Sequence, residues 1–403
     1  MPAQRHYFLD WIRILAFFVL IFYHTGMYYV SWDWHVKSPY AGHALEPLML
    51  LSSPWRLGLL FMISGVATAF MLKKFSVGAL LRQRSWRLLV PLLFGMLVIV
   101  PPQSYYEVVE KIAYPGSYAE FMRLYLRGYH GFCRGDDCLI LPTWNHLWFV
   151  AYLWVYTMVG GLLAWLLGGA RRARAGDALG RLLVGWKIIA LPVAVLALAR
   201  IALADRFPAT HALADDWYNH AQYFFLFGLG ALLALQDGFW ARVAALRFTS
   251  LALWLASWAL VLCYWSIPDA LAATPEVLQW RPLMRVVYAT CQWAPVLAVC
   301  GFGQRHLNVD GAKRRYLTEA VFPVYIAHQT LIVVMAHWLK PVQLAPAAEG
   351  AVLIVLTLAL SFGLFEAVRR VAVLRPLFGL GPLTARTSAY AAPAPAAAAP
   401  PGR

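Results

Sequence analysis

The sequence predicts an all-α, polytopic membrane protein with about ten transmembrane helices and both termini in the cytoplasm. Composition gives the first support: of 403 residues, 61% are hydrophobic and only 13% are charged, whereas an ordinary soluble domain has about 25% charged residues. Too few charges remain to cover the surface of a water-soluble globular enzyme. Intrinsic disorder is also excluded, because apolar residues dominate everywhere except the C-terminal tail.

Apolar segments of suitable length give the second support. Ten of them are long enough, or nearly so, to cross about 30 Å of hydrocarbon as a helix. The third, fifth and sixth are short or interrupted, by Pro91, by Pro192, and by Gly228 with Gly230. The ten segments are residues 8–30, 48–72, 86–102, 144–167, 188–204, 220–236, 248–266, 284–302, 316–337 and 350–373.

The distribution of basic residues gives the third support and predicts the orientation. With the N-terminus in the cytoplasm, the segments on that side carry 22 Lys and Arg against three acidic residues. The opposite segments carry 10 Lys and Arg against 13 acidic residues. Since Lys and Arg are retained on the cytoplasmic side, an even number of spans satisfies every loop. The net charge of +15 therefore follows from membrane topology, and no nucleic-acid partner is expected.

The domain organisation is simple. One membrane domain is predicted over residues 1–375, with a long outer loop at 103–143. Cys133 and Cys138 lie in this loop and can form a disulfide if it faces an oxidising compartment. Residues 384–403 are rich in Ala and Pro, so they are predicted to be a disordered cytoplasmic tail. No Cys/His spacing resembles a metal site.

The first span carries the sharpest set of candidate residues, because ionisable groups inside a bilayer are costly and often functional. Arg13 and His24 are eleven residues apart, so they share one stripe of a helix, separated by about 16 Å along its axis. Asp10 lies three residues before Arg13 and can pair with it, which lowers the cost of burial. The alternative is structural: an Asp–Arg pair that anchors the helix end and a His in an interhelical hydrogen bond.

Polar groups from other spans are predicted to lie in the same outer half of the bilayer as His24. Arg56 lies in the outer third of the second span, with Ser64 nearer its middle. The fourth span begins with His146 and Trp148. In the ninth span Tyr325, His328 and Gln329 share one face. Each histidine alone is compatible with a structural role, but their convergence favours a site.

A basic cluster precedes the third span on the predicted cytoplasmic side. It contains Arg82, Arg84 and Arg87. Such a cluster is explained by the positive-inside tendency or by anionic lipid contacts, or by binding of a phosphate-bearing ligand, which suits the planar fork of Arg.

These motifs resemble the acyltransferase-3 family of integral membrane acyltransferases. The R-x10-H pattern of Arg13 and His24 looks like the signature of that family, and ten spans with both ends inside also match. Other similar segments are Leu9 to Arg13, Phe61 to Gly65, Arg84 to Pro91, and His146 to Phe149. Residues 32–38 and 101–106 look most like the branch of the family that succinylates periplasmic glucans.

The resemblance implies an O-acyltransferase of the bacterial inner membrane. Members take an acyl group from cytoplasmic acyl-CoA, a co-substrate and not a permanently bound cofactor, and place it on a hydroxyl of an extracytoplasmic glycan. It implies that His24 is the catalytic imidazole with Arg13 as its partner, and that Arg84 and Arg87 act on the donor side. Direct transfer and an acyl-histidine intermediate are both compatible with these residues.

Two further points stay open at this level. Arg56 or His146 is a candidate to stabilise the oxyanion or the acceptor. A transporter or flippase for a polar envelope precursor is the alternative function, since its polar site would also lie near the midplane. The two halves of the sequence show no matching interruptions that would favour it.

Overall fold

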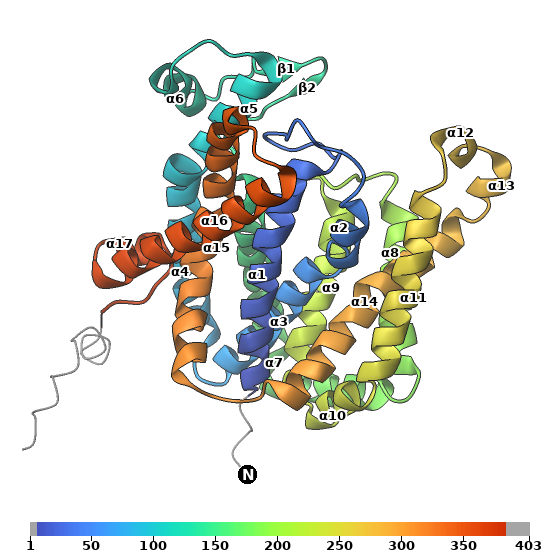
Figure 1. Cartoon of the computed structure of the whole chain (residues 1–403). Helices are drawn as coiled ribbons and strands as arrows, with labels where there is room; N and C mark the ends of the chain where they lie inside the picture. The colour runs from blue at the N-terminus through green and yellow to red at the C-terminus, as the bar shows by residue number, and fades with distance from the viewer. Residues whose placement is uncertain (1–5, 384–403) are drawn as a thin grey trace, which may run out of the picture.

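The computed structural model describes residues 6–383, and its regular structure is almost entirely helical (Figure 1). The predicted tail at 384–403 lies outside the described residues. The helices of the first half are α1 (Tyr7–Tyr29), α2 (Glu46–Ser52), α3 (Arg56–Leu72), α4 (Val77–Phe94), α5 (Pro101–Ile112), α6 (Tyr118–Leu126), α7 (Trp148–Leu182) and α8 (Lys187–Leu203). Those of the second half are α9 (Trp217–Leu233), α10 (Asp237–Ala245), α11 (Arg247–Trp265), α12 (Asp269–Ala272), α13 (Pro275–Leu278), α14 (Arg281–His306), α15 (Ala312–Leu339), α16 (Pro346–Arg370) and α17 (Leu374–Leu377).

Each of the ten predicted apolar segments forms helix. Within residues 6–383, eight helical stretches are long and apolar enough to cross a membrane: Tyr7–Tyr29, Glu46–Leu72, Val77–Ile112, Asn145–Leu182, Arg247–Trp265, Arg281–His306, Ala312–Val342 and Pro346–Arg370. The fifth and sixth predicted spans, α8 and α9, have only 17 residues each. A bend of 114° separates α9 from α10, and counting that pair as one span gives nine. The number of ten and the cytoplasmic placement of the termini stay predictions.

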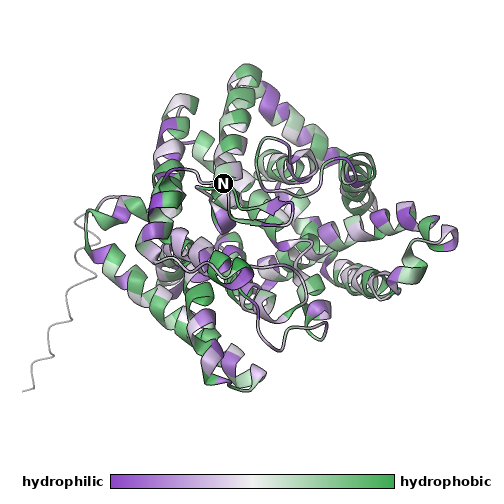
Figure 2. Cartoon of the chain, turned by 90° about the horizontal axis from the view of Figure 1, so that it is seen from above, coloured by the Kyte–Doolittle hydropathy of each residue, from purple (hydrophilic) through white to green (hydrophobic). Residues whose placement is uncertain are grey.

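The outer surface of the bundle is apolar, as a lipid environment requires. Large side chains such as Trp165, Leu198 and Trp338 are each 65% exposed. Figure 2 shows hydrophobic residues along the helices on the outside of the bundle as well as between them. In water such a surface would be a large apolar patch, whereas lipid tails cover it without cost.

The tightest helix crossing joins α3 and α9 through two glycines. A Cβ atom on Gly65 would lie 1.9 Å from the carbonyl oxygen of Phe227, and one on Gly230 would lie 2.0 Å from that of Met62. Both glycines are therefore needed for the two backbones to meet. Close approach at small residues is the usual way for membrane helices to associate, because lipid provides no hydrophobic drive between them.

The third span differs most from its prediction. The sequence predicted that it ends at residue 102 and that a loop follows, but the helical path continues from α4 through a π-helical turn, η1 (Gly95–Ile99), into α5. Pro101 and Pro102 have no N–H group, so they cannot continue the normal bonding pattern, and Pro is tolerated in the first turn of a new helix. The N–H of Gln103 donates to the carbonyl of Val100 at 2.8 Å. The carbonyl of Ile99 is therefore left without its helical donor, and it accepts a hydrogen bond from the Thr330 hydroxyl at 2.7 Å.

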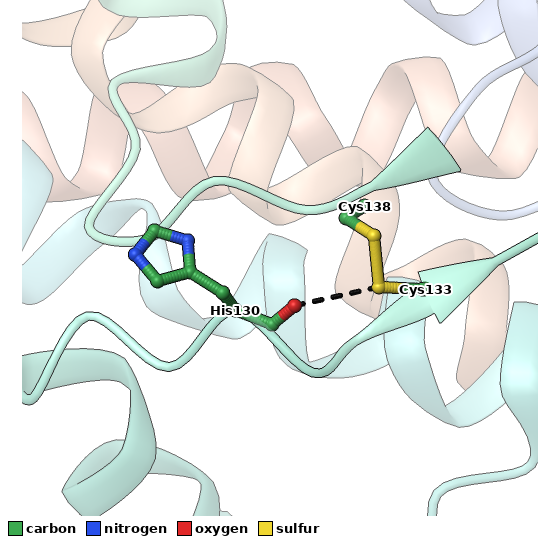
Figure 3. Close-up of a disulfide and its surroundings, with 3 residues drawn as sticks. All are labelled: His130, Cys133 and Cys138. Carbon is green, nitrogen blue, oxygen red and sulfur yellow. Dashed lines mark hydrogen bonds between the residues drawn. A yellow bond between two sulfur atoms is a disulfide. The ribbon is translucent and has the colours of Figure 1, made fainter. Parts of the chain in front are cut away.

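The rest of the predicted loop is also ordered. A capping box between Ser117 and Glu120 starts α6. The two short strands β1 (Cys133–Arg134) and β2 (Asp137–Cys138) then pair antiparallel. Cys133 and Cys138 form the disulfide that the sequence left open, and Sγ of Cys133 lies 3.4 Å from the carbonyl oxygen of His130 (Figure 3).

The first helix is central to the bundle. It packs against α3, α14, α15 and α16, and it starts at the lower end of the molecule in Figure 1, where the N-terminus lies. The strands and α6 lie at the upper end, with α12 and α13. Arg13 is therefore nearer the lower end and His24 nearer the upper end of the same helix.

Candidate active site

A direct hydrogen bond joins His24 of α1 to His328 of α15. Nδ1 of His328 lies 2.6 Å from the carbonyl oxygen of Tyr325, which can only accept, so this nitrogen must carry a proton. In a neutral ring Nε2 of His328 is then an acceptor, and it lies 2.8 Å from Nδ1 of His24. His24 therefore donates through Nδ1, which leaves its Nε2 with a free lone pair.

His146, just before α7, lies against the same pair. Its ring is 5.3 Å from that of His328, centroid to centroid. Nε2 lies 3.1 Å from the carbonyl oxygen of Ile326, and Nδ1 lies 3.3 Å from the side-chain amide of Gln103. Both nitrogens of His146 are thus engaged, so it orders the site without offering a free atom. We call His24, His146 and His328 the imidazole cluster.

The hydrogen bonds continue from this cluster toward the upper end. The amide of Gln329 donates to Oε1 of Gln103 at 3.1 Å and to Nε2 of His35 at 3.0 Å. The other nitrogen of His35 contacts Glu107, which in turn accepts from Lys111 at 2.8 Å. Every donor in this chain meets an acceptor, which fixes the orientation of the side chains.

Arg56, at the start of α3, is a buried cation close to His24. It is 5% exposed, and its guanidinium carbon lies 3.3 Å over the ring of Tyr23. Its Nε and Nη1 have no hydrogen-bond partner among the described residues. A buried guanidinium without a carboxylate is costly, so its free N–H groups suit an anionic or oxyanionic ligand.

The other two residues predicted for the outer half lie differently. The Ser64 hydroxyl donates back to the carbonyl of Leu60 at 2.8 Å, a common arrangement inside helices. Trp148 is buried and lies 4.2 Å from the ring of His211, which belongs to the loop before α9. The contacts of these two side chains do not include the imidazole cluster.

At the lower end, Arg13 lies near one acidic residue, Asp10, and near other arginines. Its Nη2 lies 3.7 Å from Oδ1 of Asp10, which is the predicted pair. Asp10 has a closer partner that the sequence did not predict: Arg314 of α15, which also bonds Asp310 at 2.7 Å. The Arg13 side chain remains 31% exposed, and its Nε is buried with no hydrogen-bond partner within residues 6–383.

Arg84 and Arg87 of α4 face the same region. Arg84 interacts electrostatically with both Arg87 and Arg13, and Arg87 donates through Nε to the carbonyl of Gly379 at 3.2 Å. Arg82 is exposed and does not share these interactions. The structure thus brings two of the three predicted donor-side arginines to Arg13. We call Arg13, Arg84, Arg87 and Arg314 the arginine cluster.

Sequence reasoning missed the residues that connect the imidazole cluster to the upper surface. His35 and Gln103 lie within the segments 32–38 and 101–106, where they served only as marks of resemblance. Glu107 and Lys111 were assigned to a loop. The i, i+4 spacing of these two, typical of a helical ion pair, was the signal that α5 continues. Within residues 6–383, no group of three or more His, Cys, Asp or Glu side chains could hold a metal ion.

Comparison with known proteins gives the family. A family model described as an acyltransferase domain, of the acyltransferase-3 type, matches residues 6–366. This chain belongs to the acyltransferase-3 family. With its membrane-spanning helices, it is a multi-pass membrane enzyme that transfers acyl groups other than aminoacyl groups.

Several curated relatives share one name. Glucans biosynthesis protein C of Salmonella typhimurium is 23% identical over 402 residues, which cover 96% of this chain and 98% of that protein. The protein of the same name from Salmonella heidelberg is 23% identical over 355 residues, or 85% of this chain and 86% of that protein. No solved structure matches the chain.

Proposed function

We propose that this chain moves an acyl group from acyl-CoA to a hydroxyl of an extracytoplasmic glycan, with His24 as the general base. The observation that carries the proposal is the hydrogen-bonded series from the Tyr325 carbonyl through His328 to His24. This series fixes the orientation of the His24 ring and leaves a lone pair on Nε2 that can accept a proton. A base oriented by a second group that is itself oriented is the usual design for activating a hydroxyl.

The chemistry is a single displacement. Nε2 of His24 takes the proton of the acceptor hydroxyl while its oxygen forms a bond to the thioester carbonyl carbon. The tetrahedral intermediate then collapses, the C–S bond breaks, and the thiolate takes the proton back from His24 to leave as the free thiol. His328 accepts from Nδ1 of His24 throughout, which fixes the tautomer of the neutral ring and holds the imidazolium in place after the proton is taken up.

Arg56 supports the oxyanion of that intermediate in this proposal. Sequence analysis left Arg56 and His146 as alternatives. Both His146 nitrogens are engaged, whereas Nε and Nη1 of Arg56 are free and buried. Donors already in place in a water-poor site stabilise developing negative charge strongly.

The arginine cluster serves the donor. With the lower end in the cytoplasm, as the Lys and Arg asymmetry predicts, acyl-CoA enters beside Arg84 and Arg87, whose forks suit its phosphates. Arg13 then lines the path of the acyl-pantetheine chain toward His24. Asp10 holds Arg13 through an ion pair and is itself held by Arg314.

The proposed acceptor is a glycan of the cell envelope. The name of these curated relatives, Glucans biosynthesis protein C, supports a glucan or related envelope glycan as the acceptor. A succinyl or acetyl group as the transferred group, and residence in the inner membrane, are proposed from the sequence resemblance to that branch of the family.

The test is thiol release by purified protein in detergent with acyl-CoA and a glycan acceptor. His24→Ala should lose at least the roughly 10²–10⁴-fold expected for a missing general base, whereas His130→Ala, an exposed imidazole, should keep wild-type turnover. Near wild-type turnover of His24→Ala would refute the proposal. Acid quenching followed by mass spectrometry of the His24 peptide decides between direct transfer and an acyl-histidine intermediate.

A further inference from the structure

A pocket of about 510 Å³ lies at the upper end and is lined in part by Arg134, Asp137 and Cys138 of the disulfide-linked strands. We call it the hairpin pocket. Its walls come from α5, from β1 and β2, and from the loops that precede α7 and α9. Among its lining residues are Asp33, Glu107, Lys111, Asp137, Trp144 and Ala212.

The lining combines hydrogen-bonding groups of both kinds with an aromatic wall. Nζ of Lys111 lies 2.7 Å from Asp33 and 2.8 Å from Glu107, so donors and acceptors alternate over a short distance. His211 also lines the pocket, and burial lowers the pKa of its imidazole, which keeps it neutral with one donor and one acceptor. A polyhydroxylated, uncharged ligand needs this mixture, since each sugar hydroxyl both donates and accepts.

The hairpin pocket is joined to the imidazole cluster. Glu107, in its wall, contacts His35, which accepts from Gln329, next to His328 in α15. On the other wall, Trp144 is two residues before His146 and donates to the carbonyl of His211 at 2.9 Å. The pocket therefore lies over the cluster, and two of its walls are continuous with residues that order the histidines.

The roof of the pocket is held in place. The Tyr125 hydroxyl of α6 bonds the carbonyls of Met96 at 2.8 Å and Thr143 at 3.1 Å. Phe121 and Phe132 pack beneath, with ring centroids 5.7 Å apart. Both rings are buried, so this outer segment has a small core of its own and presents a preformed surface to a ligand.

We infer that the hairpin pocket binds the carbohydrate acceptor and presents its hydroxyl to the imidazole cluster. The inference rests on the proposed function, because it names the acceptor site of that reaction. It does not require that chemistry in order to be tested, since binding of a carbohydrate is measurable without turnover.

The test is equilibrium binding of a short neutral oligosaccharide of glucose to the purified protein. Ala212→Trp fills the pocket and should weaken binding at least about tenfold. Ala214→Trp adds the same bulk to an exposed position of the same loop that does not line the pocket, and should bind as wild type. Unchanged binding by Ala212→Trp, or no binding by the wild type, would overturn the inference.

A second matched pair of variants tests the pocket without adding bulk to the loop before α9. Asp137 lines the pocket and Asp136, its neighbour at the tip of the strands, does not. Asp137→Asn should weaken oligosaccharide binding and Asp136→Asn should not; equal behaviour would overturn the inference. Thiol release from acyl-CoA is measured on the same preparations. Its absence in the wild type refutes the proposed function, while the binding data still decide the pocket.

Discussion

The imidazole cluster and the arginine cluster lie along the same helix, α1, yet their polar groups are satisfied in opposite ways. In the imidazole cluster every ring nitrogen except Nε2 of His24 has a hydrogen-bond partner among the described residues, and these partners fix the tautomers. In the arginine cluster cations repel one another, and Nε of Arg13 and Nε of Arg84 are buried without partners among the described residues.

This contrast has a physical meaning. A site for proton transfer must be ordered before the substrate arrives, because a wrong tautomer removes the base. A site for an anionic ligand is different: like charges held together without enough acids are destabilising until the anion binds. The imidazole cluster is thus ordered without a ligand, whereas the unpaired nitrogens of the arginine cluster fit the phosphate-bearing donor that we propose.

The orientation prediction has the largest expected effect, since labelling is all or none. In a Cys263→Ser background, a membrane-impermeant thiol reagent applied to spheroplasts should label His130→Cys. It should label Arg174→Cys only after permeabilisation, because residue 174 lies among the segments rich in Lys and Arg. Both positions are exposed. Labelling of 174 but not 130 in intact spheroplasts would invert the two regions and remove the two-sided mechanism.

The second prediction concerns the order within the imidazole cluster. His328→Phe removes the acceptor that fixes the tautomer of His24, so we expect kcat to fall on the order of 10²-fold with little change in either KM. His328→Gln keeps an acceptor oxygen and should recover part of the rate. Equal losses for the Phe and Gln variants, or a change confined to KM, would show that His328 only fills space.

The two regions were not equally predictable from the sequence. Charges inside an apolar span are visible at once, so Arg13, His24, Arg56 and His328 were found, and helical periodicity placed Arg13 and His24 on one stripe. The bond between His24 and His328 joins residues 304 positions apart in the chain, and no local pattern reports such a contact.

The residues that connect the imidazole cluster to the upper surface, Gln103 and Glu107 among them, were missed because of the two prolines that precede them. Pro101 and Pro102 end an apolar run and remove two N–H donors, which normally marks the end of a helix. The π-helical turn before them, and the Thr330 hydroxyl that takes the freed carbonyl of Ile99, allow a new helix to start at once. Gln103 and Glu107 therefore lie on a helix that points into the site. The turn depends on a partner from α15, which no reading of residues 86–112 alone could supply.

The third prediction concerns the arginine cluster. Replacing Arg84 and Arg87 together by Gln should raise the KM for acyl-CoA about tenfold or more, because hydrogen bonds to charged groups contribute about 1.5–3 kcal/mol each. Lys at both positions should recover only part, since a point charge cannot reproduce the planar fork. Arg82→Gln is the matched control from the same helix. An unchanged KM in correctly inserted double variant would assign these arginines to orientation alone.

The last prediction concerns the crossing of α3 and α9, which supports the structure around both clusters. Gly65→Ala or Gly230→Ala places a methyl group within about 2 Å of a facing backbone oxygen, so α3 and α9 must move apart. We expect a loss of about 1–3 kcal/mol in the free energy of unfolding, the usual cost of overpacking, measured by thermal unfolding in detergent. Gly228→Ala, whose added Cβ meets nothing within 4 Å, controls for the loss of glycine itself.

The same two variants should also change the kinetics. Because Arg56 begins α3, a displaced α3 should lower kcat through the oxyanion contact. It should leave the KM for acyl-CoA unchanged, since the residues of the arginine cluster lie on α1, α4 and α15. A rise in that KM would mean that the two regions are mechanically coupled through the α3–α9 crossing, and the contrast between them would then describe one site and not two.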